Sequence, residues 1–212
     1  MQQLTDGQRS LIAAFPAEFA GDAEVVLAVM PASRFAPPGS FPVVVQGERV
    51  SIPERIYNGE PVAGAVESLS RRQRQLLHCL YSRHHDGRVR QRHLAEVVGS
   101  ADPWVVPYVV RLAGEYVLEI LVDIRNALRD LDAPGVGAYG QFIVDNPEFF
   151  ARTQRRVVSY WSCYYREGVH ASFRGYPGCT VLDQLRSAAA ESAGRPWPSL
   201  APRGWAGVDG YC

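Results

Sequence analysis

The first third of the chain alternates between helical and extended patterns of apolar residues. Apolar side chains recur at helical spacing over residues 5–20, which predicts a short helix there. The β-branched run over residues 23–30 predicts a buried strand. Residues 43–45 and 50–52 flank Gly47, and this pattern predicts a hairpin with the glycine in its turn.

From Leu69 onward the apolar residues follow the period of amphipathic helices. We expect helices at residues 71–83, 89–98, 103–131, 147–166 and 180–192. The third of these is either one long helix with a kink near Pro107 or two helices that break at Gly114. Pro134 and the glycines that follow it predict a loop over residues 134–140.

Three of the expected helices begin with a recognisable capping signal. Ser70 is the expected N-cap of the first helix. Asn146 has the same role for the fourth helix, in which Pro147 occupies the first position. Thr180 and Asp183 have the spacing of a capping box and predict the start of the last helix.

Together these elements predict an α+β fold, mainly α, in which an N-terminal hairpin or small sheet packs on a bundle of five or six helices. Three strands cannot bury their hydrophobic faces alone, so we expect a single domain over residues 1–212. Within this domain, residues 1–62 form the β-containing part, residues 63–194 the helical part and residues 195–212 an irregular tail. The tryptophans of the tail predict that it packs against the body of the protein.

The composition excludes several classes of protein without naming a function. The 22 basic residues balance 22 acidic residues, so no global field attracts nucleic acid or anionic lipid. All the basic residues are arginines, which we attribute to a GC-rich, bacterial genome, although arginine also suits the recognition of carboxylate and phosphate. The N-terminus lacks the basic leader and apolar run of a signal peptide.

The longest apolar stretch, residues 104–124, carries charged side chains that are costly at the centre of a bilayer, so we expect no membrane span. The four cysteines form no CxxC pair, which predicts free thiols in a reducing cytoplasm. The chain has no Gly-rich phosphate loop, nucleophile elbow, zinc-protease motif or dinucleotide fingerprint, and we expect no cofactor.

An arginine-rich segment over residues 71–93 is the first candidate site. Its arginines are Arg71, Arg72, Arg74, Arg83, Arg88, Arg90 and Arg92. They form either a solvated helix face that pairs with acids or a nucleic-acid footprint. In the second interpretation, residues 69–112 resemble the start of a winged helix-turn-helix. This resemblance implies that the helix after Asp102 enters the major groove.

The adjacent His84, His85 and Asp86 allow a second interpretation. They resemble the His-Asp pair of HD-type phosphohydrolases, which hold a divalent metal for phosphoester cleavage. A metal-assisted hydrolase of this kind needs these residues to converge with the acids of residues 115–123. In the alternative interpretation, Asp86 simply caps the following helix.

Charged residues recur at every fourth position of an otherwise apolar stretch, namely Arg111, Glu115, Glu119 and Asp123. They form either a carboxylate ladder for metal or acid–base chemistry, or an exposed edge or buried network. We favour the second interpretation because the Glu-x-x-His spacing of bundle metal sites is absent. The arginines expected to pair with these acids are Arg152, Arg155 and Arg156.

An aromatic belt spans residues 160–166, which read YWSCYYR. Tyr160 and Tyr164 share one face of the expected helix, and Trp161 and Tyr165 share another. This pattern indicates either core packing with half-exposed tyrosines or a binding surface, because tyrosine, tryptophan and arginine dominate the hot spots of interfaces.

The run Asp86-Gly87-Arg88-Val89-Arg90, followed by Leu94 and Val97, resembles the turn and second helix of a HEAT-type helical repeat. The resemblance covers residues 71–130, with a second unit over residues 103–130. It implies a protein-binding helical surface and no catalytic activity.

We therefore interpret the chain as a non-catalytic binding protein whose expected partner is another protein, with nucleic acid as the alternative. Its expected binding residues are Arg71, Arg74, Arg88, Arg90, Arg92, Tyr160, Trp161, Tyr164 and Tyr165. The enzymatic alternative is a metal-assisted hydrolase that uses His84, His85, Asp86, Glu115 and Glu119. The sequence leaves the oligomeric state open.

Overall fold

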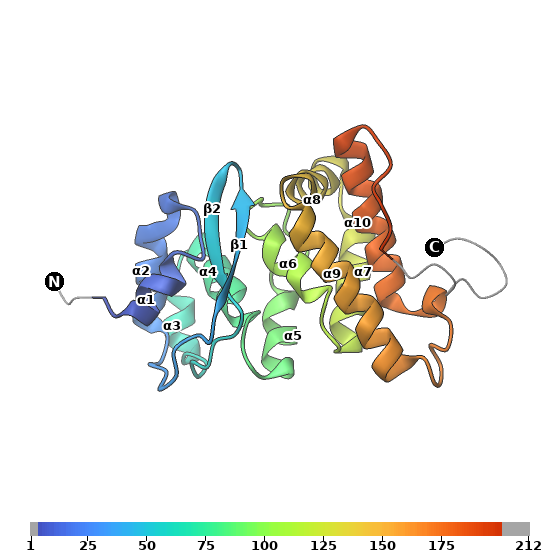
Figure 1. Cartoon of the computed structure of the whole chain (residues 1–212). Coiled ribbons are helices and arrows are strands. Elements are labelled where there is room, and N and C mark those ends of the chain that lie inside the picture. The colour runs from blue at the N-terminus through green and yellow to red at the C-terminus, as the bar shows by residue number, and fades with distance from the viewer. Residues whose placement is uncertain (1–3, 201–212) are drawn as a thin grey trace. The chain divides into compact units, whose positions relative to one another are not determined.

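The computed structural model describes residues 4–200 of the chain, which divides into two compact units (Figure 1). Unit 1 is Met1–Val97 and unit 2 is Val98–Cys212. The boundary therefore falls inside the expected helical part and not near residue 62. A single domain over the whole length stays a prediction.

Unit 1 contains five α-helices, a short 3₁₀ helix and a two-stranded sheet among its described residues. In chain order they are α1 (Asp6–Ile12), η1 (Ala17–Phe19), α2 (Ala20–Val29), β1 (Ser40–Val45), β2 (Glu48–Pro53), α3 (Ala63–Glu67), α4 (Arg71–Tyr81) and α5 (Gly87–Ala95).

Unit 2 is helical throughout its described residues. Its elements are α6 (Val106–Leu112), α7 (Leu118–Asp130), α8 (Ala133–Asp145), α9 (Pro147–Tyr160), the π-helix η2 (Trp161–Tyr165), the 3₁₀ helix η3 (Phe173–Gly175) and α10 (Pro177–Ala193). The predicted fold class, α+β and mainly α, is confirmed. The described residues contain ten α-helices instead of five or six, because a predicted strand and a predicted loop are helices, one predicted segment is two helices, and α3 was not predicted.

The predicted hairpin is confirmed, and its register follows from the turn. β1 and β2 are antiparallel, and Val45 pairs with Glu48 across a two-residue turn. Gln46 and Gly47 both have positive φ angles, of 50° and 84°, which is the conformation that matches the twist of a hairpin. The backbone N–H of Ser51 donates to the carbonyl of Ala13 at 2.8 Å, so the hairpin is tied to the end of α1.

The strand predicted over residues 23–30 is wrong, because this segment forms α2. Its buried residues are Ala23, Val26, Leu27 and Met30, a spacing of three and four that belongs to a helix. The β-branched composition of the run favours a strand locally, but burial of one helical face against α4 decides the structure.

The structure treats the three predicted helix N-caps differently. Ser70 caps α4 with a complete capping box, as predicted. Asn146 precedes α9 but does not cap it, because its side-chain amide donates to the carbonyl of Phe142 at the end of α8. The last helix begins at Pro177, three residues before the predicted Thr180, with proline in its first turn.

The segment expected over residues 103–131 is two helices, α6 and α7, with a break over residues 113–117. The polar stripe is therefore interrupted. Arg111 lies on α6, Glu115 lies in the connection, and Glu119 and Asp123 lie on α7.

The loop predicted over residues 134–140 is wrong, because these residues belong to α8. Asp132 caps this helix through a 2.9 Å bond from the N–H of Gly135. At Gly140 a Cβ would lie 2.8 Å from the carbonyl carbon of Ala188 and closer still to its oxygen. The glycine therefore allows α8 to pack directly on the backbone of α10, and this tertiary contact outweighs its low helix propensity.

The C-terminal tail is described only as far as Leu200. Trp197 is half-buried, and the amide of Gln154 on α9 accepts a bond from the N–H of Leu200 at 3.2 Å. The other tryptophan of the expected tail, Trp205, lies outside the described residues. Among residues 4–200, every helix is too short or too polar to span a bilayer.

Gly140 and Gly137 provide a matched test of the packing between α8 and α10. We expect Gly140→Ala to lower the free energy of unfolding by about 3 kcal/mol, because the added Cβ meets backbone atoms that cannot move aside. Gly137→Ala, on the same helix with nothing within 4 Å of the added Cβ, should raise stability by about 0.5–1 kcal/mol. Urea unfolding measures both, and equal effects would contradict this packing.

Candidate functional site

Two arginines of the arginine-rich segment are internal structural residues. Arg90 on α5 is 1% exposed, and its guanidinium donates to the carbonyls of His84 and His85, at 2.9 Å each. Arg83 is also buried and donates to the carbonyls of Pro53 and Glu54. The assignment of Arg90 to a binding surface is therefore corrected, because a guanidinium enclosed by backbone carbonyls cannot reach a partner.

Most of the remaining arginines of this segment have partners inside unit 1. Arg72 pairs with Asp22 of α2 at 2.5 Å, and Arg92 pairs with Glu60 at 2.5 Å. Arg74 donates to the carbonyl of Leu69 at 2.8 Å. The other two positions, Arg71 and Arg88, are exposed. The seven arginines of the segment therefore do not form one exposed basic face.

The helix that the winged-helix resemblance places in a major groove is α6. All seven of its residues, Val106–Leu112, are buried. A helix with no exposed side chain cannot read base edges, so this expectation is wrong for the structure described.

A histidine and carboxylate cluster in unit 1 links three segments of the chain. Glu60, in the connection before α3, lies 3.0 Å from Nε2 of His93 on α5. The Nδ1 atoms of His93 and of His78 on α4 lie 2.9 Å apart. Tyr81 stacks on His93 with ring centroids 4.8 Å apart and donates to the carbonyl of Gly59.

If both imidazoles are neutral, only one placement of their hydrogens gives every close contact of this cluster a donor and an acceptor. A carboxylate only accepts, so Nε2 of His93 carries a hydrogen and Nδ1 carries a lone pair. Nδ1 of His78 then donates to it. Burial, followed by the charge of His93, lowers the pKa of His78 to about 4. Burial also lowers the pKa of His93, although Glu60 acts in the opposite direction.

The residues proposed for a metal centre have structural roles or lie apart along the chain. Asp86 caps α5 by accepting from the N–H of Arg88 at 2.8 Å, as the alternative interpretation predicts. Nδ1 of His84 accepts from the N–H of Asp86 at 3.1 Å. Within residues 4–200, no group of three or more His, Cys, Asp or Glu side chains could hold a metal ion. His84, His85 and Asp86 belong to unit 1, whereas Glu115 and Glu119 belong to unit 2, so the metal-assisted hydrolase stays a prediction.

Unit 2 brings three tyrosines together. The ring of Tyr116 lies 5.9 Å from that of Tyr160 and 6.1 Å from that of Tyr164, and the last two rings lie 6.1 Å apart. Tyr164 is 64% exposed and Tyr116 is 48% exposed. The guanidinium of Arg156 lies over the ring of Tyr160 at 5.9 Å. We call these four residues, Arg156, Tyr116, Tyr160 and Tyr164, the tyrosine surface.

The other two aromatic residues of the belt, Trp161 and Tyr165, bond and pack within unit 2. Trp161 is buried, donates to the carbonyl of His170 at 2.7 Å and packs on Phe173. The hydroxyl of Tyr165 donates to the carbonyl of Tyr116 at 2.5 Å and its ring stacks on Tyr176. The assignment of Trp161 to a binding surface is therefore corrected, because its side chain is buried, and the belt has a structural side and an exposed side.

The π-helix η2 and the break between α6 and α7 create this arrangement. The N–H of Arg166 bonds to the carbonyl of Trp161 with the spacing of five residues typical of a π-helix, a feature often found at functional sites. Arg156 also donates to the carbonyl of Gly114 at 3.2 Å and so holds the break. Sequence reasoning missed Tyr116, whose only signal was its position beside the expected break at Gly114.

The His78–His93 pair predicts a pH dependence of stability. Both pKa values are lower in the folded state than the ordinary 6.5, so between about pH 4 and 6.5 the unfolded chain binds more protons. The contribution of the pair to the free energy of unfolding should therefore be at its full value above pH 6.5 and decrease as the pH is lowered. The slope reaches up to about 1.4 kcal/mol per pH unit for each group.

Urea unfolding at several pH values between 7.5 and 4.5 measures this slope. His78→Gln removes one of the two titrating groups and should flatten it. An unchanged slope in this variant would show that the pair does not titrate as described.

The pairing of the arginines predicts weak binding to nucleic acid. Because Arg72 and Arg92 are neutralised by acids and Arg90 is enclosed, we expect no retention of a mixed-sequence DNA duplex in a filter assay at low salt. Retention that falls steeply with added salt would contradict this and restore the nucleic-acid interpretation.

Comparison with known proteins adds no relative, since no protein-family model, no curated protein and no solved structure matches this chain. The resemblance to a HEAT-type repeat stays a prediction.

Proposed function

We propose that this chain is a non-catalytic binding protein that recognises a polypeptide through the tyrosine surface of unit 2. One observation carries the proposal. Three tyrosine rings lie next to one another, and Tyr164 is 64% exposed and Tyr116 48% exposed. Single exposed apolar residues are common, but a contiguous aromatic group on a surface is typical of an interaction site.

The residue types of the surface are those that contribute most to binding energy. Tyrosine and arginine are enriched among hot-spot residues, since each offers a large contact area together with a hydrogen-bonding group. The rings of Tyr116 and Tyr164 can stack on a partner. Their hydroxyls can then form hydrogen bonds with the partner or with water, so that no buried polar atom is left unsatisfied. Arg156 adds a cation for carboxylates or carbonyl oxygens of the partner.

Contacts behind the surface hold it in place before a partner arrives. The hydroxyl of Tyr165 fixes the backbone of Tyr116, and Arg156 fixes the carbonyl of Gly114 while lying over Tyr160. Side chains that are already ordered lose less conformational entropy on binding, which favours affinity.

The exposed charges of α9 favour a partner with acidic side chains. Arg152 and Arg155 are exposed on the same helix as Arg156. Opposite charges on the partner would raise the association rate and fix its orientation. We also propose that the protein acts in the cytoplasm, as the predicted free thiols indicate.

Substitution of Tyr164 tests the proposal. Proteins captured from a cell lysate by the immobilised chain are compared quantitatively with those captured by Tyr164→Ala and by Val62→Ala. Val62 is a 75% exposed apolar residue of unit 1 and is the control. We expect a partner that the original chain and Val62→Ala retain and that Tyr164→Ala loses.

The partner is then purified and titrated calorimetrically. Loss of a hot-spot tyrosine should raise its Kd by about 10–30-fold, which corresponds to about 1.4–2 kcal/mol. Equal capture by all three chains, or an unchanged Kd, would contradict a role for this surface.

A further inference from the structure

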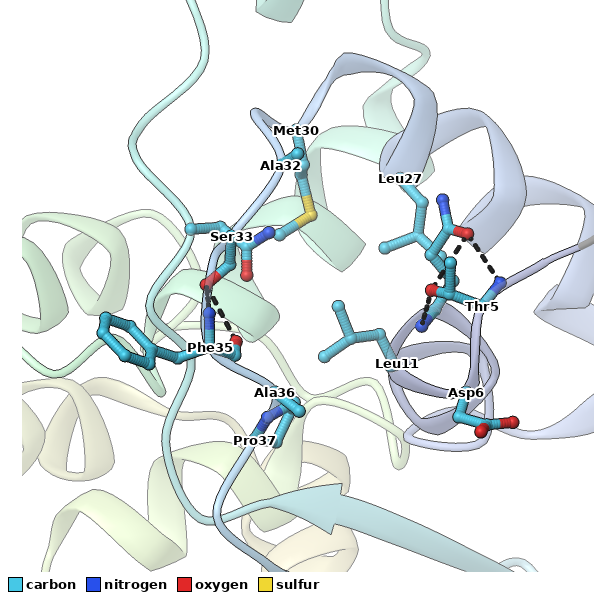
Figure 2. Close-up of a pocket in the computed structure, with 13 residues that line it drawn as sticks. Thr5, Asp6, Leu11, Leu27, Met30, Ala32, Ser33, Phe35, Ala36 and Pro37 are labelled. Carbon is cyan, nitrogen blue, oxygen red and sulfur yellow. Dashed lines mark hydrogen bonds between the residues drawn. The ribbon is translucent and has the colours of Figure 1, made fainter.

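Unit 1 contains a pocket of about 520 Å³ between α1, α2 and the segment that follows α2 (Figure 2). Thirteen residues line it, and most of its walls are apolar. Figure 2 shows Leu11 of α1, Leu27 of α2 and the Met30 sulfur directed into the space, with Ala36 and Pro37 on the opposite side.

The polar side chains of the lining are already bonded within the protein, including the carboxylate of Asp6, which pairs with Arg9. Thr5 and Gln8 complete the capping box of α1, with bonds of 2.9–3.2 Å. The hydroxyl of Ser33 bonds to the backbone of Phe35, and the amide of Asn58 donates to the carbonyl of Pro31 at 2.9 Å. A ligand therefore meets few unsatisfied donors and acceptors, which disfavours a strongly polar or charged molecule.

The same bonds hold the wall opposite the helices in place. Asn58 ties the start of the segment at Pro31, Ser33 closes a local turn, and the ring of Phe35 packs edge-on against Tyr57 at 5.8 Å. A wall that is ordered before binding is typical of small-molecule sites. Met30 supplies the flexible side chain that adapts such a site to the shape of its occupant.

We infer that this pocket binds a small, uncharged, mainly apolar organic molecule. Its volume lies in the range of about 300–1,000 Å³ that is usual for ligand sites. Side chains in protein interiors normally fill such space, so a preformed apolar hollow of this size leaves contacts for a ligand to make. The inference is independent of the tyrosine surface, which belongs to unit 2.

The uncharged fluorescent amine N-phenyl-1-naphthylamine is a suitable probe, since its emission rises in apolar surroundings. We expect saturable binding to the full chain with one site. Ala32→Phe/Ala36→Phe places two large side chains at exposed positions of the pocket wall, where they can fill the pocket without disturbing the core. This variant should weaken binding about tenfold or more.

Ala17→Phe is the matched control, because Ala17 is also exposed and lines a separate, shallower depression of unit 1. It should leave the affinity unchanged. Circular dichroism checks that the variants fold. Equal affinity in all chains, a selective loss in the control, or an emission increase that never saturates would overturn the inference.

Carbon–proton NMR of the original chain gives a second measurement that needs no variant. The probe should shift the methyl signals of Leu11, Leu27 and Met30, which line the pocket. Methyl groups of unit 2, such as those of Val169, should not move. Shifts spread over both units, or none at the three pocket residues, would equally overturn the inference.

Discussion

Unit 1 depends on two buried guanidinium groups that bind backbone carbonyls. Burying an arginine is costly, and hydrogen bonds offset part of that cost here, since Arg83 donates to the carbonyls of residues 53 and 54 and Arg90 to those of residues 84 and 85. These bonds join the end of the hairpin, the end of α4 and α5. The connection that follows β2 is thereby fixed, and with it Glu60, which reaches His93, and Asn58, which holds the pocket wall.

A different constraint, close backbone packing, governs unit 2. Gly140 lets α8 lie directly against α10, and the break between α6 and α7 brings Tyr116 to the exposed side of η2. Arg156 links the break between α6 and α7 to the aromatic rings, since it donates to the carbonyl of Gly114 and lies over the ring of Tyr160. The tyrosine surface is thus a consequence of how helix ends are satisfied, and the hydroxyl of Tyr165 holds the backbone of Tyr116 by donating to its carbonyl.

Local sequence patterns predicted the structure correctly where a segment's hydrogen bonds are made within the segment itself. The hairpin turn at Gly47, the capping box of Ser70 and the cap at Asp86 depend on neighbours only a few residues away. Predictions failed where a distant segment decided the outcome. The glycines near Gly140 indicate a loop unless α10 is known to pack on them, and the run over residues 23–30 becomes a helix because α4 covers one of its faces.

The sequence by itself determined the fold class, the starts of α4 and α9, and the residue types available for binding. It could not separate Arg90, which is enclosed, from Arg88, which is exposed, because both carry the same charge in the same segment. Nor could it join Tyr116 to Tyr160 and Tyr164, or Glu60 to His93, across more than thirty residues. Only the tertiary structure decided these pairings, because burial and proximity arise from packing between segments and not from the order of residues along the chain.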